Sequence, residues 1–153
     1  MYVAANITAR RLTNALRKLP PSKKKWAQVT IDGVTIKDLR AIGQRCWFEY
    51  HCYEGHDSSD AKLWYHSHQQ ATVLKVDADY GAVYTTIRER AESGHLLTYQ
   101  VQFNDGFVWT VFEDELLNSR SQFERPDPPS PPDTSQHHAN HRPTEKKRHE
   151  LSC

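Results

Sequence analysis

The clearest pattern of apolar and polar positions lies in residues 99–117. Apolar and polar side chains alternate over 99–103, which predicts a strand with one face on a core. An Asn-Asp-Gly sequence at 104–106 has the residues of a tight turn with positive φ. Residues 107–112 then predict a second, more apolar returning strand. The acidic stretch at 113–117 predicts a short helical or 3₁₀ turn whose carboxylates face solvent.

Other segments supply further strand material before this hairpin. Residues 43–50, 63–65 and 70–76 are rich in β-branched or aromatic side chains, and polar, turn-rich stretches separate them. A charged stretch at 87–94 predicts a second polar excursion. Several short strands at this spacing predict a mainly β domain over 43–123, built as a small antiparallel barrel or sandwich.

Two smaller units precede the predicted barrel. Residues 1–25 predict a basic helical arm and linker, because apolar side chains recur at helical spacing until Pro20. Residues 26–42 predict a small β-turn-helix module, with a strand, an Asp-Gly turn and a short helix over 36–42. Thr35 and Asp38 have the spacing of a capping box for that helix.

The composition changes abruptly after residue 123. Five prolines lie within 126–132, which favours extended polyproline structure, and histidines recur among polar residues beyond it. Such a segment has few apolar side chains to bury. The sequence therefore predicts a disordered Pro/His-rich tail over 124–153, whose residues 126–132 would suit a polyproline-binding domain.

Charge is distributed unevenly along the chain. The net charge is +7 over residues 1–42, −6 over 43–123 and zero over 124–153, which gives +1 for the whole sequence. A basic arm before an acidic domain suggests a polyanion as the partner of one part and a cationic ligand as the partner of the other.

Cysteine usage and hydropathy predict the location. The three cysteines are an odd set, no apolar run approaches the ~18 residues of a membrane span, and the first residues lack the pattern of a signal peptide. We therefore expect an intracellular protein without a membrane partner.

The segments that start at Gly43, Gln70 and Tyr99, together with the Asn-Asp-Gly turn and the acidic close at 113–116, resemble the Tudor domain and its chromo-barrel relatives. The resemblance covers 43–120. It implies a small, strongly bent SH3-like barrel of about five antiparallel strands, and a nuclear, non-catalytic chromatin-type reader or adaptor that binds a cationic peptide such as a methylated histone-like tail.

Domains of this family hold methylated lysine or arginine in an aromatic cage. A methylated ammonium keeps its charge and loses hydration, so aromatic ring faces attract it by ~0.5–2 kcal/mol each. The family position in the second strand falls near Gln69, with Tyr65 and His66 close by in sequence, so either a neighbour substitutes or the cage is incomplete. The cage residues that the resemblance implies are Tyr50, Tyr65, Phe103, Asp105 and Trp109.

Other interpretations stay open. Small barrels need aromatic cores, so each of these rings can be a packing residue instead. The domain can also be a protein-protein scaffold without a methyl cage, or a nucleic-acid-binding module that uses its basic arm. The candidate phosphate-binding residues of that arm are Arg10, Arg11, Arg17, Lys18, Lys23, Lys24 and Lys25.

Metal and enzyme motifs are weak in this sequence. A zinc site can be imagined from Cys46, His51, Cys52, His56, His66 and His68, but the spacing matches no standard finger, so no metal or cofactor is predicted. The sequence has no nucleophile elbow, Gly-rich phosphate loop or His-Glu-x-x-His motif. It predicts a binding protein and not an enzyme.

Overall fold

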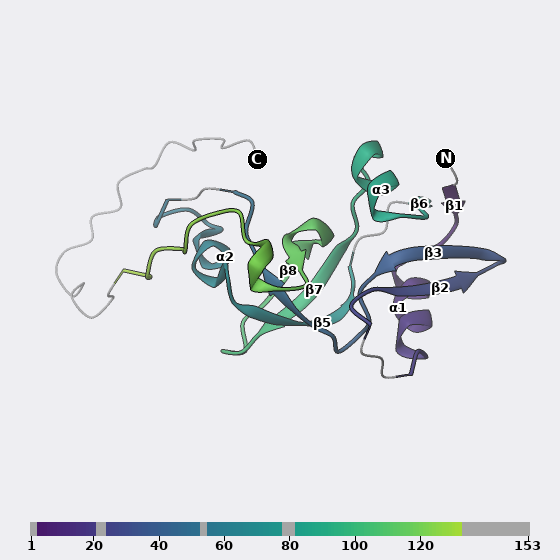
Figure 1. Cartoon of the computed structure of the whole chain (residues 1–153), viewed down its shortest axis with the longest axis horizontal. Coiled ribbons are helices and arrows are strands. Elements are labelled where there is room, and N and C mark those ends of the chain that lie inside the picture. The colour runs from purple at the N-terminus through teal and green to yellow at the C-terminus, as the bar shows by residue number, and fades with distance from the viewer. Residues whose placement is uncertain (1–2, 21–23, 53–54, 78–81, 133–153) are drawn as a thin grey trace.

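The computed structural model describes residues 3–20, 24–52, 55–77 and 82–132. Its main body is one five-stranded antiparallel sheet that curls into a half-barrel (Figure 1). The strands are β4 (Arg45–Phe48), β5 (Gln70–Val76), β7 (Thr98–Phe103), β8 (Val108–Phe112) and β9 (Leu116–Leu117). Their spatial order is β8-β7-β5-β4-β9. The prediction of a mainly β domain with antiparallel strands is confirmed.

The inner face of the curled sheet carries the core. Tyr99, Val101 and Phe103 alternate along β7 and are all buried, as the period of two predicts. Val73 of β5 lies opposite Val101, and the register between these strands shifts after Val73. A shift of this kind bends a strand and increases its twist, which helps the sheet to curl. Phe48 of β4 completes the buried centre.

The hairpin of β7 and β8 forms as predicted, with Gly106 at φ 87° in the turn. The predicted 3₁₀ turn also forms, as η1 (Glu113–Glu115). The expected exposure of its carboxylates is wrong for two of them, because Glu113 and Glu115 are buried and Asp114 alone of the three is exposed. These two side chains accept hydrogen bonds inside the fold, and so they do not face water.

The module at 26–42 is a β-hairpin, and the helix predicted over 36–42 is wrong. The strands β2 (Ala27–Ile31) and β3 (Val34–Leu39) pair across the Asp-Gly turn, whose two residues both have positive φ. Thr35 does not cap a helix, because its hydroxyl lies 3.0 Å from that of Thr30 on the opposite strand. Cross-strand pairing therefore prevailed over the local capping pattern.

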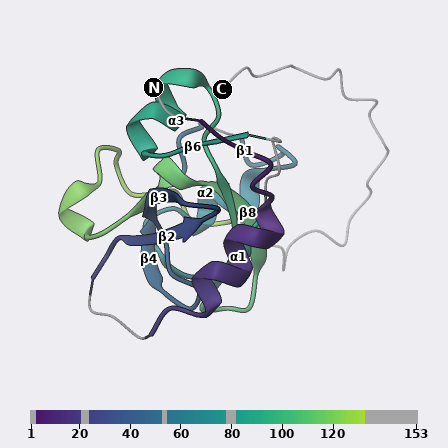
Figure 2. The same ribbon diagram turned by 90° about the vertical axis from the view of Figure 1, so that its right-hand side faces the viewer.

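The N-terminal helix is shorter than the sequence predicted. A strand, β1 (Val3–Ala5), comes first and pairs with β6 (Ala82–Tyr84), and α1 (Ala9–Arg17) follows. Thr8 caps the helix, since its hydroxyl accepts a hydrogen bond from the Arg11 N–H at 3.2 Å. Figure 2 shows α1 beside the β2-β3 hairpin, against which it packs.

Two further helices replace segments that the sequence did not predict as helical. The predicted strand at 63–65 is wrong, because α2 (Ala61–His66) occupies this stretch and β4 pairs directly with β5 around it. The polar excursion at 87–94 contains α3 (Ile87–Ser93). Thr86 caps α3 by accepting from the Glu89 N–H, and Gly94 ends it with φ 75°.

A buried arginine joins the smaller elements to the sheet. Arg90 of α3 donates to both carboxylate oxygens of Glu113, at 2.8 and 3.1 Å. Its terminal nitrogens also donate to the carbonyl oxygens of Tyr84 in β6 and of Lys37 and Asp38 in β3. The ion pair therefore connects α3, β6, the β2-β3 hairpin and η1 at one point.

A second buried arginine connects the same hairpin to the other edge of the sheet. The backbone N–H of Arg40 donates to the Tyr99 hydroxyl at 3.0 Å. Its guanidinium donates to the carbonyl oxygens of Lys25 and Leu116, at 3.0 and 2.8 Å, and to the side-chain oxygen of Asn118. The hairpin and the five-stranded sheet are thus fixed to each other by charged hydrogen bonds.

The chain after η2 (Arg120–Gln122) is fastened to the end of β4. The buried Glu49 accepts hydrogen bonds from the backbone N–H groups of Glu124 and Arg125, at 3.1 and 3.2 Å. The Nε2 atom of His68 lies 2.6 Å from the same carboxylate. Phe123 stacks on the His68 ring, with 4.0 Å between the centroids.

These contacts correct part of the prediction for the tail. Residues 124 and 125 are bonded to Glu49, and Asp127 lies 2.9 Å from Nδ1 of His68, so disorder does not begin at 124. Residues 128–132 have no regular secondary structure. The remainder of the predicted tail, 133–153, lies outside the described residues.

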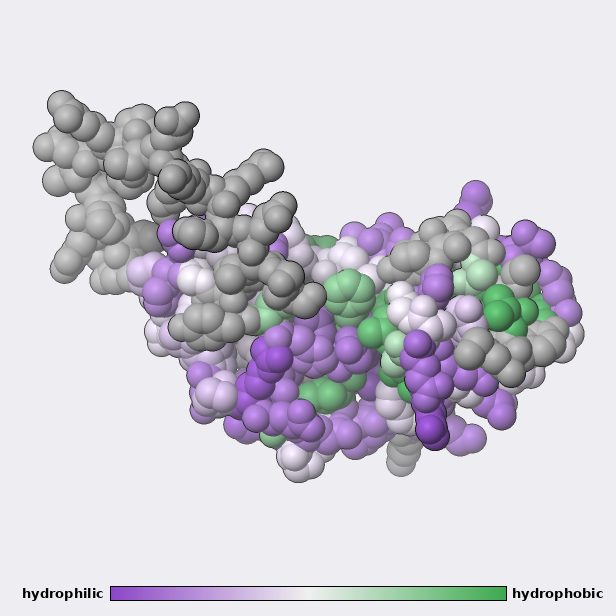
Figure 3. Space-filling model, turned by 90° about the horizontal axis from the view of Figure 1, so that it is seen from above, coloured by the Kyte–Doolittle hydropathy of each residue, from purple (hydrophilic) through white to green (hydrophobic). Residues whose placement is uncertain are grey.

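The described surface is mostly hydrophilic. Figure 3 shows apolar residues in separate small areas among hydrophilic ones on the face seen from above. In the described ranges, every helix is too short or too polar to cross a membrane.

Replacing Glu113 with alanine should lower the free energy of unfolding by about 3–5 kcal/mol, because the Arg90 charge is then buried without its partner. The double substitution Arg90→Met with Glu113→Leu removes both charges and should cost much less. Urea denaturation measures both. Glu92→Ala is the matched control, since it breaks an exposed pair with Arg88. Wild-type stability in Glu113→Ala would contradict this role.

Acid should release the segment after η2. Burial opposes ionisation of Glu49, but the hydrogen bonds from Glu124, His68 and Arg125 outweigh it and hold the pKa of Glu49 below its ordinary value. The resulting stabilisation is present above the unfolded pKa of about 4.3 and is lost as pH falls through the lowered value. Amide protection at Glu124 and Arg125, measured by hydrogen exchange, should fall across that range.

Glu49→Gln is the control for this acid effect, because the amide does not titrate. Protection of the two amides should then be weaker at neutral pH and nearly independent of acid. Equal acid sensitivity in wild type and Glu49→Gln would show that another group fastens the segment.

Candidate functional site

A pocket beside the edge strand β8 of the curled sheet gathers aromatic and acidic side chains. It has a volume of about 510 Å³ and lies between the end of β4, the start of α2, β8 and η1. Trp109 of β8 lies opposite Val101 in the register, so both side chains project from the same face of the sheet. We call it the aromatic-acidic pocket and define it by Tyr50, Asp60, Trp109, Phe112, Asp114 and Glu115.

The acidic side of the pocket is built by η1. The Glu115 carboxylate accepts hydrogen bonds from the backbone N–H groups of Phe112 and His51, at 3.0 and 3.3 Å. Burial raises the pKa of Glu115 above its ordinary value, although these two hydrogen bonds act to lower it. Asp114 is more exposed, and its carboxylate lies 3.6 Å from Nδ1 of His51. With Asp60 at the start of α2, the wall favours a positively charged group.

Two of the predicted cage residues, Phe103 and Asp105, lie against a histidine of α2. The His66 ring lies 4.6 Å from the Phe103 ring and 4.5 Å from the Phe107 ring between centroids. Its Nε2 atom is 2.6 Å from the Asp105 carboxylate, and its Nδ1 faces the carbonyl oxygen of Lys62. Both ring nitrogens therefore lie against oxygen atoms of the chain.

The Asp105 carboxylate is correspondingly engaged inside the chain. It accepts hydrogen bonds from the Phe107 N–H, at 2.9 Å, and from His66, which together hold its pKa below the ordinary value. Phe103 is a core residue that also packs on Phe48. The structure therefore assigns these two predicted cage residues to a contact with the chain's own imidazole.

The two groups of predicted residues contact different side chains of α2. Leu63 of this helix lines the aromatic-acidic pocket, whereas His66 contacts Phe103 and Asp105. Tyr50 and Trp109 are thus together in the pocket, and Phe107 stacks on Trp109 with 5.5 Å between centroids. The family resemblance had placed all these residues in one cage.

Tyr65 is in a third position. Its hydroxyl lies 2.7 Å from Nδ1 of His56, and its ring stacks on those of His56 and Trp64. It does not line the aromatic-acidic pocket. The stack is formed by residues of α2 and of the loop before it. Tyr65 is therefore not in the same pocket as Trp109.

The predicted phosphate-binding residues of α1 share one exposed face. The helix buries its opposite face against the core, and the exposed face contains Arg10, Arg11, Arg17 and Lys18. Arg11 is paired with Asp32 at 2.9 Å. Lys24 and Lys25 are exposed next to Trp26, and Lys25 donates to the carbonyl oxygen of Asn118. Lys23 lies outside the described residues.

The cysteine and histidine side chains considered for zinc serve other contacts. Cys46 is buried in the core, and His66 and His68 contact carboxylates of the fold. Within the part of the chain that the structure describes, no three His, Cys, Asp or Glu side chains gather as a group able to hold a metal ion.

Sequence reasoning missed Asp60, Phe112, Asp114 and Glu115 as pocket residues. An exposed phenylalanine at the end of an apolar strand, followed at once by three acidic residues, was a readable signal for an aromatic and acidic surface. The contribution of Asp60 was not readable, because it depends on where α2 begins.

The chain has no match among family models, curated proteins or solved structures. Its site is therefore described from its own geometry.

The structure predicts different stability costs for two aromatic residues. Phe103→Ala removes a ring that is 2% exposed and should lower the free energy of unfolding by about 3–5 kcal/mol. Trp109→Ala removes a ring that is 41% exposed and should cost clearly less, because much of it already contacts water. Urea denaturation of both variants compares them. Similar costs would contradict the separation of core and pocket.

Proposed function

We propose that the chain is a non-catalytic adaptor that binds a cationic side chain of a peptide in the aromatic-acidic pocket. The observation that carries the proposal is that Tyr50, Trp109 and Phe112 line one pocket together with three carboxylates. Methylated lysine of a histone-like tail is the ligand of choice, and chromatin in the nucleus is the corresponding setting.

The chemistry of the pocket suits that ligand. A methylated ammonium has weak hydration and a full charge, so it gains from aromatic ring faces and from nearby carboxylates at once. The Trp109 ring already has one neighbour, Phe107, and its exposed part borders the pocket. Asp114 and Asp60 supply negative charge at the wall, which also attracts a basic peptide before it binds.

The internal histidine supports the same interpretation. His66 lies against the rings of Phe103 and Phe107 while its Nε2 contacts the Asp105 carboxylate. Next to the pocket, the chain thus already places a nitrogen base between aromatic rings and an acid. The aromatic-acidic pocket offers the same types of group to a ligand from another chain.

The sheet supports the proposed family. We propose that it is an SH3-like barrel of Tudor or chromo-barrel type, because it has five short, strongly bent antiparallel strands and a tight turn between β7 and β8. The insertions at α2 and at β6-α3 distinguish it from a minimal domain of this type.

Trp109→Ala should weaken binding of a trimethyl-lysine peptide by roughly 2- to 30-fold, as expected for loss of one cation-π contact. The full chain is titrated with matched methylated and unmethylated peptides at two salt concentrations, and calorimetry gives the affinities. Binding should be stronger for the methylated peptide and should weaken as salt rises.

Val108→Ala is the matched control, because Val108 is 37% exposed and does not line the aromatic-acidic pocket. It should leave the affinity unchanged. Equal binding of the two peptides, or unchanged affinity in a folded Trp109→Ala variant, would remove the basis of the proposed function.

A further inference from the structure

Three adjoining hollows lie among α1, β2, β3 and the start of β4. Their volumes are about 570, 410 and 440 Å³, and Leu19 lines all of them. Pro20, Lys24 and Ala41 are shared by the second and third. They form one continuous surface, which we call the basic band.

Positive charge predominates in the basic band. Its described charged residues comprise six cations and two carboxylates, which are Arg11, Arg17, Lys18, Lys24, Lys37, Arg45, Asp32 and Asp38. Both carboxylates are engaged within the fold. Asp32 is paired with Arg11, and Asp38 accepts a hydrogen bond from the Ile87 N–H at 3.2 Å. The aromatic-acidic pocket has the opposite charge.

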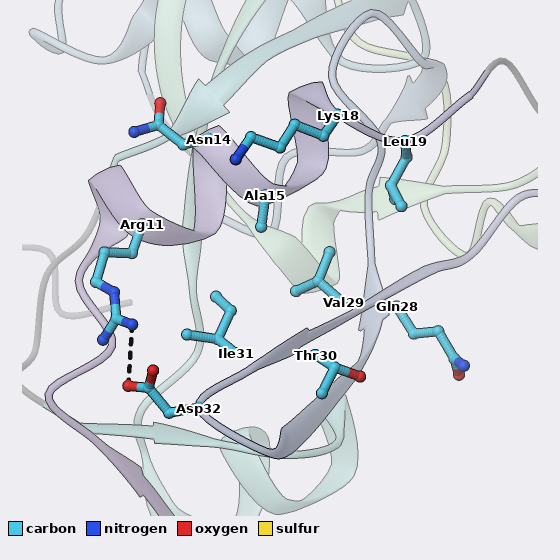
Figure 4. A pocket seen from close by; sticks show the side chains of 10 residues that line it. All are labelled: Arg11, Asn14, Ala15, Lys18, Leu19, Gln28, Val29, Thr30, Ile31 and Asp32. Carbon is cyan, nitrogen blue, oxygen red and sulfur yellow. Dashed lines mark hydrogen bonds and ion pairs between the residues drawn. The ribbon is translucent and has the colours of Figure 1, made fainter.

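Figure 4 shows the first hollow, where the polar ends lie at the rim and apolar side chains lie between them. Arg11 turns toward Asp32, while Lys18 extends along the helix. Leu19 and Val29 lie between α1 and β2. The hollow therefore has an apolar floor with a cationic edge.

The third hollow adds a fixed guanidinium. Arg45 donates to the side-chain oxygens of Gln70 and Asn104, at 2.8 and 2.9 Å. These partners are neutral amides, so they orient the group and leave its positive charge uncompensated. Arg17 of α1 lines the same hollow and is exposed.

The second hollow contains an aromatic platform. Trp26 is 39% exposed, and the Arg40 guanidinium lies over its ring at 3.8 Å from the centroid. Arg40 is itself held by hydrogen bonds to the sheet, so the ring is supported by a rigid group. Lys37 and Lys24 line the same hollow. An aromatic ring among cations suits a stacked base flanked by phosphates.

We propose that the basic band binds a single strand of nucleic acid, with phosphates against Arg17, Lys18, Lys37 and Arg45 and one base stacked on Trp26. A single strand is favoured over a duplex, because stacking on Trp26 needs a base whose face is not already covered by its neighbours in a helix. This site is independent of the proposed peptide site, since the two share none of their lining residues.

The test is fluorescence anisotropy of the full chain with a labelled oligothymidine strand and with a duplex of equal length. The single strand should bind more tightly. The logarithm of its association constant should fall against the logarithm of salt concentration with a slope of about −3, as expected for four phosphate contacts at ~0.7 each.

Three substitutions at two positions test the separate parts of the site. Lys37→Gln should reduce the salt slope by about 0.7. Trp26→Ala should weaken single-strand binding by roughly 5- to 150-fold, whereas Trp26→Phe should restore much of it, because a phenyl ring also stacks. Thermal unfolding of each variant establishes that it is folded.

Arg88→Gln is the matched control, because it removes one exposed positive charge from α3, away from the band. It should leave the single-strand affinity unchanged, as should Trp109→Ala in the peptide pocket. The proposal is overturned by absence of oligonucleotide binding at low salt, by duplex binding as tight as that of the single strand, or by full affinity in folded Trp26→Ala. Tighter binding to anionic vesicles than to oligonucleotide would also overturn it.

Discussion

The buried ion pair between Arg90 and Glu113 is the interaction on which the arrangement of the smaller elements depends. Glu113 also accepts the Leu97 N–H at 2.9 Å, so its carboxylate fixes the start of β7 as well as α3. A buried charge is tolerated when its N–H groups have hydrogen-bond acceptors. For Arg90, backbone carbonyl oxygens of β3 and β6 supply such acceptors beside Glu113. Arg40 is held at the opposite edge by its terminal nitrogens, which donate to Lys25, Leu116 and Asn118, whereas its Nε has no hydrogen-bond partner among the described residues. The half-barrel and the N-terminal hairpin therefore form one body through two arginines.

Much of the sheet could be predicted from the sequence because its signals are local. Alternation defined β7, the Asn-Asp-Gly turn defined the hairpin, and the apolar run at 70–76 matched β5. The helix predicted over 36–42 failed because Thr35 fits a capping position and a cross-strand pair equally well, and the hairpin turn decided between them. By contrast, α3 was readable, since Thr86 and Glu89 have the capping spacing and Gly94 follows at the end. The charged composition of residues 87–94 led instead to the prediction of a polar excursion.

The candidate site was less predictable, because it depends on contacts between segments far apart in the sequence. Tyr50 and Trp109 were identified and lie in one pocket, but Phe103 and Asp105 were placed there too. No local pattern indicates that His66 occupies the space beside them, since its position follows from a six-residue helix packing on the sheet. The family resemblance indicated the types of residue in the site. The packing of α2 on the sheet determines which of these residues contact each other.

The segment that contains α2 can change without disturbing the pairing of the strands on either side of it. Because Trp47 of β4 pairs with Gln70 of β5, the two ends of the intervening segment are held close together, and the entropy cost of a longer or shorter connection grows only slowly with length. Substitutions and changes of length in this loop can therefore accumulate while the strand register is kept. The loop supplies a wall of the pocket through Asp60 and Leu63. One wall of the pocket can therefore change its shape and charge while the strand pairing that holds the sheet together stays the same.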